Sequence, residues 1–290
     1  MSDTQGVRNV RIRTNGIGLA ADIRGEDTDP IVIFLHGGGQ TRHSWNATAE
    51  KVARSGWQSV NVDLRGHGDS DWAPDGTYHH FAFRDDIIGL AEQFDRPVLV
   101  GASLGGMCSL QAIGKVGPNL ARALVLVDIT HRINPEGGRR IGSFMNSGSQ
   151  GFATLEDAAD AIAAYNPHRP RPTNLEGLKK NLRFRDGRWH WHYDPRFLTA
   201  IEIPREMEHS PKSPAGDAAA RLGEFGTPTL LVRGKLSDIV DPEHVTELLE
   251  LIPHAESIDV SNAGHMVVGD SNDIFNDSII KFLDRNRDAK

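Results

Sequence analysis

A serine flanked by glycines is the residue of this sequence best suited to chemistry. The segment Gly101–Gly106 reads GASLGG and matches the G-x-S-x-G pattern, between a β-rich apolar run over Pro97–Val100 and a helical pattern over Leu104–Val116. On a sharp turn from strand to helix, a serine presents its hydroxyl, and the residues two positions away must lack side chains to avoid a clash. The pattern predicts Ser103 as a nucleophile, although an ordinary glycine-rich turn with a capping serine has the same sequence features.

A histidine followed by three glycines, His36–Gly39, comes directly after the fully apolar run Ile31–Leu35. Successive glycines leave the backbone bare, so its N–H groups can bind developing negative charge. We therefore predict an oxyanion hole formed by the N–H groups of Gly38 and Leu104, with Gly39 as the reserve donor. The histidine of this segment is expected to hold the loop at the end of the strand.

A base and a carboxylate follow later strand-like runs. His265 lies on a glycine-containing loop after Ser257–Val260, and Asp238 follows Thr229–Val232. A carboxylate that accepts the Nδ1–H of a histidine fixes its tautomer and stabilises the imidazolium that forms. Together with Ser103, these residues occur in the order Ser, Asp, His, and this conjunction predicts a catalytic triad.

The elements that must position these residues are short strands alternating with helices. Apolar, β-rich runs recur at Val7–Arg13, Gly18–Arg24, Ile31–Leu35, Ser59–Val62, Pro97–Val100, Ala123–Val127, Thr229–Val232 and Ser257–Val260. Helical patterns follow at Ser44–Arg54, Phe81–Phe94, Leu104–Val116, Pro242–Ile252 and Ile274–Leu283. Such alternation predicts an α/β fold with a mostly parallel, doubly wound sheet of about eight strands.

One region interrupts this alternation. Residues 131–223 contain no apolar strand run, and we expect them to form a mainly helical cap inserted into a core made of residues 1–130 and 224–290. Within the insertion, residues 131–198 carry 11 Lys and Arg against 7 Asp and Glu. A basic cap could steer a carboxylate-bearing substrate, or it could simply be a solvated face.

Composition limits the classes of function. The chain has 290 residues, a formal net charge of −7 and a single cysteine, Cys108. An acidic balance disfavours nucleic acid as a partner, because phosphate binding requires a basic surface. No apolar run approaches the about 20 residues of a membrane helix, and the first residues lack the features of a signal peptide. We expect a cytoplasmic enzyme that acts on a small molecule without a metal or cofactor.

The motifs together resemble the α/β-hydrolase fold superfamily, in its capped group of serine hydrolases. The matching segments are His36–Gly39, Asp63–Ser70, Gly101–Gly106, Gly234–Asp238 and Ala263–His265. This group includes esterases, lactonases, carbon–carbon bond hydrolases, epoxide hydrolases and cofactor-free haloperoxidases, and it places its cap after the sixth strand, where the insertion falls here. We expect the loop Asp63–Ser70 to be structural.

The resemblance also raises a rival for the acid. Some members of the group take their carboxylate from the sixth strand, and Asp128 ends the run Ala123–Val127. Its alternative role is to cap the entry to the insertion. We prefer Asp238 as the acid of the triad and keep Asp128 as the rival.

The activity that the resemblance implies is hydrolysis of a small to medium ester or lactone. The alternatives are carbon–carbon bond hydrolysis of a diketone-like acid, cofactor-free perhydrolase or haloperoxidase activity, and a non-enzymatic receptor role. An epoxide hydrolase is disfavoured, because such enzymes use aspartate where this chain has Ser103 and need cap tyrosines, of which the insertion offers only Tyr165 and Tyr193.

Six residues are candidates for the walls of the substrate pocket. They are Gln40, Trp45, Met107, Trp189, Trp191 and Met266. The alternation in Trp189–Tyr193 indicates an extended segment with tryptophans on one face. Each of the six also has a structural alternative, since Trp45 could pack a helix on the sheet and the cap tryptophans could pack the cap on the core.

Overall fold

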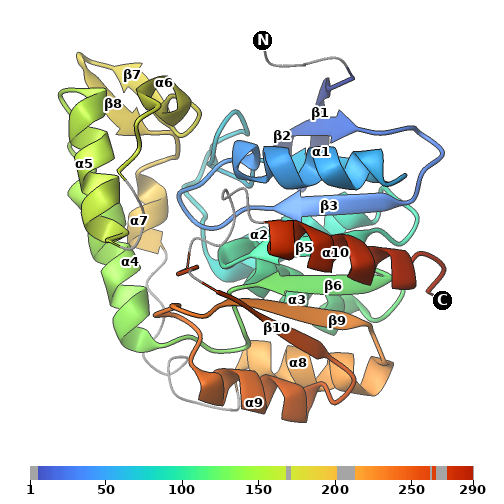
Figure 1. Cartoon of the computed structure of the whole chain (residues 1–290). Coiled ribbons are helices and arrows are strands. Elements are labelled where there is room, and N and C mark those ends of the chain that lie inside the picture. Colours follow the sequence, from blue (N-terminus) through green and yellow to red (C-terminus); the bar gives the residue numbers. More distant parts are fainter. Residues whose placement is uncertain (1–5, 168–170, 201–212, 262, 266–272, 290) are drawn as a thin grey trace.

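The computed structural model describes residues 6–167, 171–200, 213–261, 263–265 and 273–289. Eight strands form one sheet in the order β1-β2-β4-β3-β5-β6-β9-β10 (Figure 1). They are β1 (Arg8–Thr14), β2 (Ile17–Arg24), β3 (Ile31–Leu35), β4 (Gln58–Val62), β5 (Val98–Ala102), β6 (Ala123–Val127), β9 (Thr229–Gly234) and β10 (Glu256–Val260). Strands β1 and β2 are antiparallel to their neighbours, and the others are parallel. The mostly parallel sheet is confirmed, and each expected run forms a strand.

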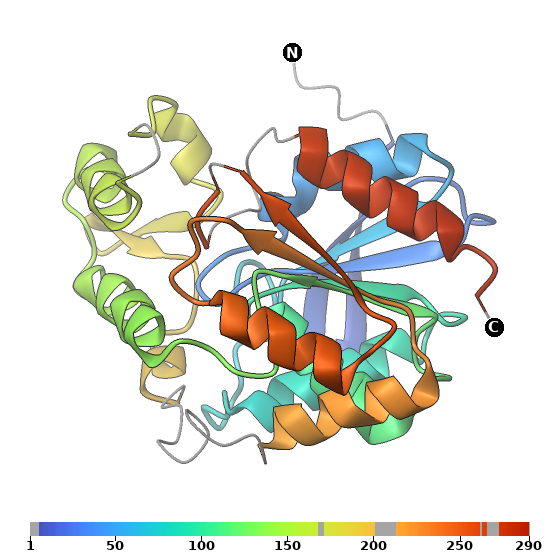
Figure 2. The same cartoon turned by 60° about the horizontal axis from the view of Figure 1, so that its bottom comes forward.

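Helices cover both faces of this sheet. They are η1 (Arg42–Trp45), α1 (Asn46–Arg54), α2 (His80–Ala91), α3 (Leu104–Val116), α8 (Pro214–Phe225), α9 (Pro242–Leu251) and α10 (Asp273–Arg285). Figure 2 shows α10 on one side of the sheet and α8 on the other. Alternate residues of a strand point to opposite faces, so in β3 Val32 and Phe34 pack toward α1 and α10, whereas Ile33 and Leu35 pack toward α2 and α3.

The insertion after β6 forms a separate layer beside the sheet (Figure 1). It contains α4 (Pro135–Ser147), α5 (Leu155–Tyr165), α6 (Leu175–Leu178), the hairpin β7 (Leu182–Arg185) and β8 (Arg188–Trp191), and α7 (Arg196–Ala200). The extended tryptophan segment is found in β8. The hairpin as a whole was not expected, because its strands are only four residues long and too rich in arginine to read as apolar runs.

Helix α8 lies against the core and not in the cap. A Cβ atom built on Gly114 of α3 would come within 2.5 Å of the Cβ of Ala218, so the two helices pack almost backbone to backbone. We therefore propose that the insertion ends before Ser213, earlier than the boundary at residue 223 expected from the sequence.

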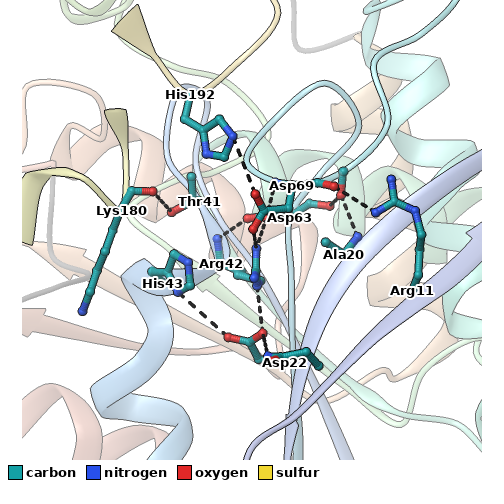
Figure 3. A network of polar contacts seen from close by, with 12 residues as sticks. Arg11, Ala20, Asp22, Thr41, Arg42, His43, Asp63, Asp69, Lys180 and His192 are labelled. Carbon is teal, nitrogen blue, oxygen red and sulfur yellow. Dashed lines mark hydrogen bonds and ion pairs between the residues drawn. The ribbon is translucent and has the colours of Figure 1, made fainter. Parts of the chain in front are cut away.

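A buried arginine ties the core to the cap. The guanidinium of Arg42 lies 2.9 Å from Asp22 of β2 and 2.8 Å from Asp69, and it also contacts Asp63 (Figure 3). Asp69 in turn lies 3.1 Å from Arg183 of the cap hairpin. A charged group in the interior is stable only when it is paired and hydrogen-bonded. The contacts of Asp63 and Asp69 support the structural role expected for the loop Asp63–Ser70, because this loop links β4 to the cap.

Among the described residues, no helix combines the length and the apolar character that crossing a membrane requires.

Candidate active site

Ser103 occupies a strained turn between β5 and α3. Its backbone has φ +44° and ψ −112°, a region that side chains rarely adopt. A Cβ atom on Gly105 would lie 2.6 Å from the carbonyl oxygen of Leu35, and one on Gly101 would overlap the backbone nitrogen of Gly106. The glycines are therefore required by close backbone packing, as the motif predicted. Strain of this kind costs about 1–3 kcal/mol and clusters at functional sites.

The structure pairs His265 with Asp128 and not with Asp238. The Nδ1 atom of His265 lies 2.8 Å from Oδ2 of Asp128. Asp128 is completely buried and also accepts hydrogen bonds from the Gly234 N–H at 2.8 Å and the Ser237 hydroxyl at 2.6 Å. An ionised carboxylate makes Nδ1 the protonated nitrogen of the imidazole, which leaves Nε2 as the basic one. The preference for Asp238 as the partner of His265 is thus wrong, and the rival carboxylate occupies that position.

Asp238 points away from this pair, toward the cap. Its carboxylate lies 3.1 Å from Nη1 of Arg140 in α4 and is 34% exposed. Its backbone carbonyl lies against Gly137 of the same helix, closely enough that no side chain would fit there. The preceding residue, Ser237, faces Asp128 instead. In the loop after β9, the hydroxyl of Ser237 therefore faces the buried Asp128, whereas the carboxylate of Asp238 faces the cap.

The two expected oxyanion donors lie beside Ser103. Gly38 and Leu104 line the same cavity as Ser103, and within the described part of the chain no residue accepts a hydrogen bond from either amide. The Gly39 amide is already engaged, because it donates to Nε2 of His67 at 3.1 Å. Of the candidate donors in the glycine loop, Gly38 is thus the one with an available N–H.

Two buried histidines hold this glycine loop. His36 bonds the Gly37 carbonyl through Nδ1 at 2.7 Å and accepts the Leu64 N–H through Nε2 at 3.0 Å. His67 uses its two nitrogens in the same way. Burial lowers the pKa of His36 to about 4 and that of His67 to about 3, so both rings are neutral at pH 7. His36 therefore fixes the loop, as expected.

Ser103 and His265 open into one cavity of about 440 Å³ beneath the cap. Gln40, Met107 and Trp191 line it, as expected, and Gln40 also accepts the Gly37 N–H at 3.1 Å. Its cap wall is largely apolar and includes Ile133, Ile141, Phe144, Met145, Ile162 and Leu198. The sequence did not single out these side chains, because nothing in their local pattern distinguishes a cavity wall from a core.

Two predicted pocket residues lie elsewhere. Trp45 is completely buried and packs between Phe34 of β3 and Phe275 of α10. Trp189 packs on Phe184 across the cap hairpin. Both predictions are wrong, because large aromatic side chains gain as much from core packing as from forming a pocket wall. Met266 lies outside the described residues.

The basic residue that reaches the cavity is neutralised. Arg132 lines the cavity, but its Nε and Nη2 atoms both lie 2.6 Å from the carboxylate of Glu247 in α9. Arg140 is likewise paired with Asp238. The positive charge of the cap therefore does not supply a free cation at these two positions. Across the described ranges, no group of three or more His, Cys, Asp and Glu side chains could hold a metal ion.

Comparison with known proteins identifies the family of this chain. The chain belongs to the alpha/beta hydrolase fold family, which matches residues 30–271. It is 30% identical over 266 residues to an esterase of Mycobacterium tuberculosis, covering 87% of this chain and 82% of that protein. It is 27% identical over 277 residues to an sn-1-specific diacylglycerol lipase of Mus musculus, covering 89% and 82%. An α/β hydrolase of Novosphingobium aromaticivorans of known structure has a TM-score of 0.81 at 25% identity, covering 96% of this chain and 98% of that one.

Proposed function

We propose that this α/β hydrolase is a serine hydrolase that cleaves a small to medium ester or lactone by acyl transfer. The observation that carries the proposal is the convergence of three features on one cavity. These features are a serine on a strained turn, a histidine whose Nδ1 faces a buried carboxylate, and two available backbone N–H groups.

In the proposed reaction, Nε2 of His265 takes the proton of Ser103 as Oγ attacks the carbonyl carbon. The N–H groups of Gly38 and Leu104 stabilise the oxyanion. His265 then protonates the leaving group, which departs and leaves an acyl-enzyme. Water, activated by the same histidine, hydrolyses this ester. Asp128 orients the imidazole and stabilises its charged form throughout.

The size and lining of the cavity support a small substrate with apolar parts. A volume of about 440 Å³ lies within the range of small-molecule pockets. The relatives named as an esterase and a lipase act on ester bonds by their names. Cap residues line the cavity together with core residues, and this arrangement disfavours polymers, because it limits the access of a long chain to Ser103.

The test is hydrolysis of short p-nitrophenyl esters by the wild type and by Ser103→Ala. We expect turnover by the wild type and a loss of about 10⁴- to 10⁶-fold in kcat in the variant, because the nucleophile is gone. Circular dichroism and thermal unfolding provide the control for folding.

Two outcomes would contradict the proposal. Equal turnover by both proteins would show that Ser103 is not the nucleophile. No turnover of any ester by a folded wild type would favour another bond, such as the carbon–carbon bond of a diketone-like acid, or a receptor role.

A further inference from the structure

One buried polar side chain in the cavity has no role in the proposed reaction. Gln111 of α3 is 4% exposed and lines the cavity that holds Ser103. Neither its Oε1 nor its Nε2 has a hydrogen-bond partner among the described residues. Buried polar groups are nearly always hydrogen-bonded, so a carboxamide that no described residue pairs on either atom is free to hydrogen-bond a ligand in the cavity.

The position of Gln111 relative to the nucleophile follows from helix geometry. Three residues that line the cavity are spaced four apart. They are Ser103, which immediately precedes α3, and Met107 and Gln111 within this helix. Residues four apart lie on the same face of a helix. At 1.5 Å per residue, Gln111 lies about 12 Å along the axis from Ser103, and its side chain leans back toward the helix N-terminus. Met107 covers the interval with an apolar surface.

A second side chain with an unpaired polar atom adjoins this end of the cavity. His80, at the start of α2, lines the cavity, and its buried Nδ1 has no hydrogen-bond partner among the described residues. The thiol of Cys108 lies 3.7 Å from the His80 carbonyl oxygen, which places His80 against the stretch of α3 one turn before Gln111. Burial lowers the pKa of His80, so its ring is uncharged at neutral pH.

We propose that Gln111, with His80 beside it, forms a subsite that hydrogen-bonds an uncharged polar group at the far end of an otherwise apolar substrate. The inference rests on the proposed function, because the length of the substrate is counted from Ser103. The subsite narrows the proposed substrate class to an ester or lactone whose chain ends in a carboxamide, a hydroxyl or a similar neutral group.

The chemistry of the subsite selects against the two other kinds of chain end. A carboxamide offers one acceptor and two donors, and it is matched by a group that both donates and accepts. An alkyl end would leave these atoms buried and unpaired, which a binding site penalises strongly. A carboxylate would need a cation, and Arg132, which lines the same cavity, is bound to Glu247.

The test compares esters that differ only at the chain end. On the acyl side, the probes are the p-nitrophenyl esters of pimelic acid monoamide, of its isostere 7-methyloctanoic acid and of pimelic acid. On the leaving-group side, the corresponding acetates are those of 6-hydroxyhexanamide, 6-methylheptanol and 6-hydroxyhexanoate. We expect the amide of at least one series to exceed its isostere and its acid in kcat/KM by about tenfold or more.

The deciding variant is Gln111→Met, which keeps the length of the side chain and removes its polar atoms. We expect the ratio of amide to isostere to fall by about tenfold in this variant. Met107→Leu is the matched control on the same helix face, and it should change the two rates alike and preserve their ratio. Gln111→Asn, which withdraws the carboxamide by one methylene, is the second variant in case the methionine variant does not fold.

The subsite would be overturned if the ratio of kcat/KM for the amide to kcat/KM for its isostere were the same in the wild type and in folded Gln111 variants. A preference of the wild type for the carboxylate esters would overturn it as well. Either result would leave the proposed function intact if Ser103→Ala still abolishes turnover. If the wild type hydrolyses no ester, calorimetry with pimelic acid monoamide and 7-methyloctanoate still tests the subsite, because binding needs no nucleophile. Equal effects of Gln111→Met on the two affinities would then overturn it.

Discussion

The loops that follow β6 and β9 each carry an aspartate near the site, yet they differ in almost every physical respect. Asp128 is fully buried and accepts three hydrogen bonds, from His265, Ser237 and Gly234. Asp238 is one-third exposed and forms an ion pair with Arg140 of the cap. A buried carboxylate held by several donors is ordered and charged, whereas an exposed ion pair contributes little. The difference shows that the surroundings of an aspartate, and not its place in a motif, make it a partner for histidine.

Within the comparison of these two loops, the largest expected effect comes from neutralising the buried aspartate. Asp128→Asn should lower kcat for the best ester by about 10⁴-fold, because an amide N–H facing Nδ1 would force the wrong tautomer on His265. The asparagine oxygen can still accept the bond from the Gly234 N–H, and the Ser237 hydroxyl, which shares Oδ2 with His265, can accept a bond from the new amide, so the fold should persist. Steady-state kinetics with the matched variant Asp238→Asn provides the comparison. A larger loss in Asp238→Asn than in Asp128→Asn would reverse the assignment of the acid.

An intermediate effect is expected on the stability of the protein at acidic pH, and it arises from the buried loop after β6. His131 on this loop is 3% exposed, and burial lowers its pKa from 6.5 to about 4. Its Nε2 lies 3.6 Å from Glu247, which opposes this shift, and the neighbouring Arg132 and His244 reinforce it. Between pH 6.5 and 4, His131 is protonated in the unfolded chain but stays neutral in the folded protein. Its contribution to the free energy of unfolding therefore falls as the pH drops from about 6.5 toward 4.

The contribution of one such histidine is at most about 1.4 kcal/mol per pH unit. Urea unfolding at pH 7 and pH 5 should therefore show a smaller loss of stability in His131→Gln than in the wild type, by about 1–2 kcal/mol. Identical losses in the two proteins would mean that His131 is protonated in the folded protein without loss of stability. The buried loop after β6 would then not differ from the exposed loop after β9 in this respect.

The smallest effect is expected at the exposed aspartate. Asp238→Asn should change kcat/KM for short esters by less than about threefold and stability by less than about 1 kcal/mol, because partly exposed ion pairs are screened by water. Thermal unfolding at low and high salt tests the contribution of the pair with Arg140. A destabilisation of several kcal/mol would show that this contact is essential to the docking of the cap.

The sequence by itself was sufficient to predict the sheet, the glycine-flanked turn at Ser103 and the glycine loop His36–Gly39. The central strand Ile31–Leu35 is apolar at every position, and glycines recur where backbones touch, as at Gly101 and Gly105. Each of these signals is local. The inserted hairpin of β7 and β8 escaped prediction, because its strands lack an apolar run.

Only the tertiary structure decided which aspartate meets His265 and which side chains line the cavity. Asp128 and Asp238 both follow parallel strands, so both lie at the same edge of the sheet, and the paths of their loops determine which reaches His265. Trp45 and Gln111 show the same dependence, because burial against Phe34 or beside a cavity depends on residues distant in the chain. The order of the residues sets which side chains are available near the site, and packing between segments far apart in sequence determines which of them meet.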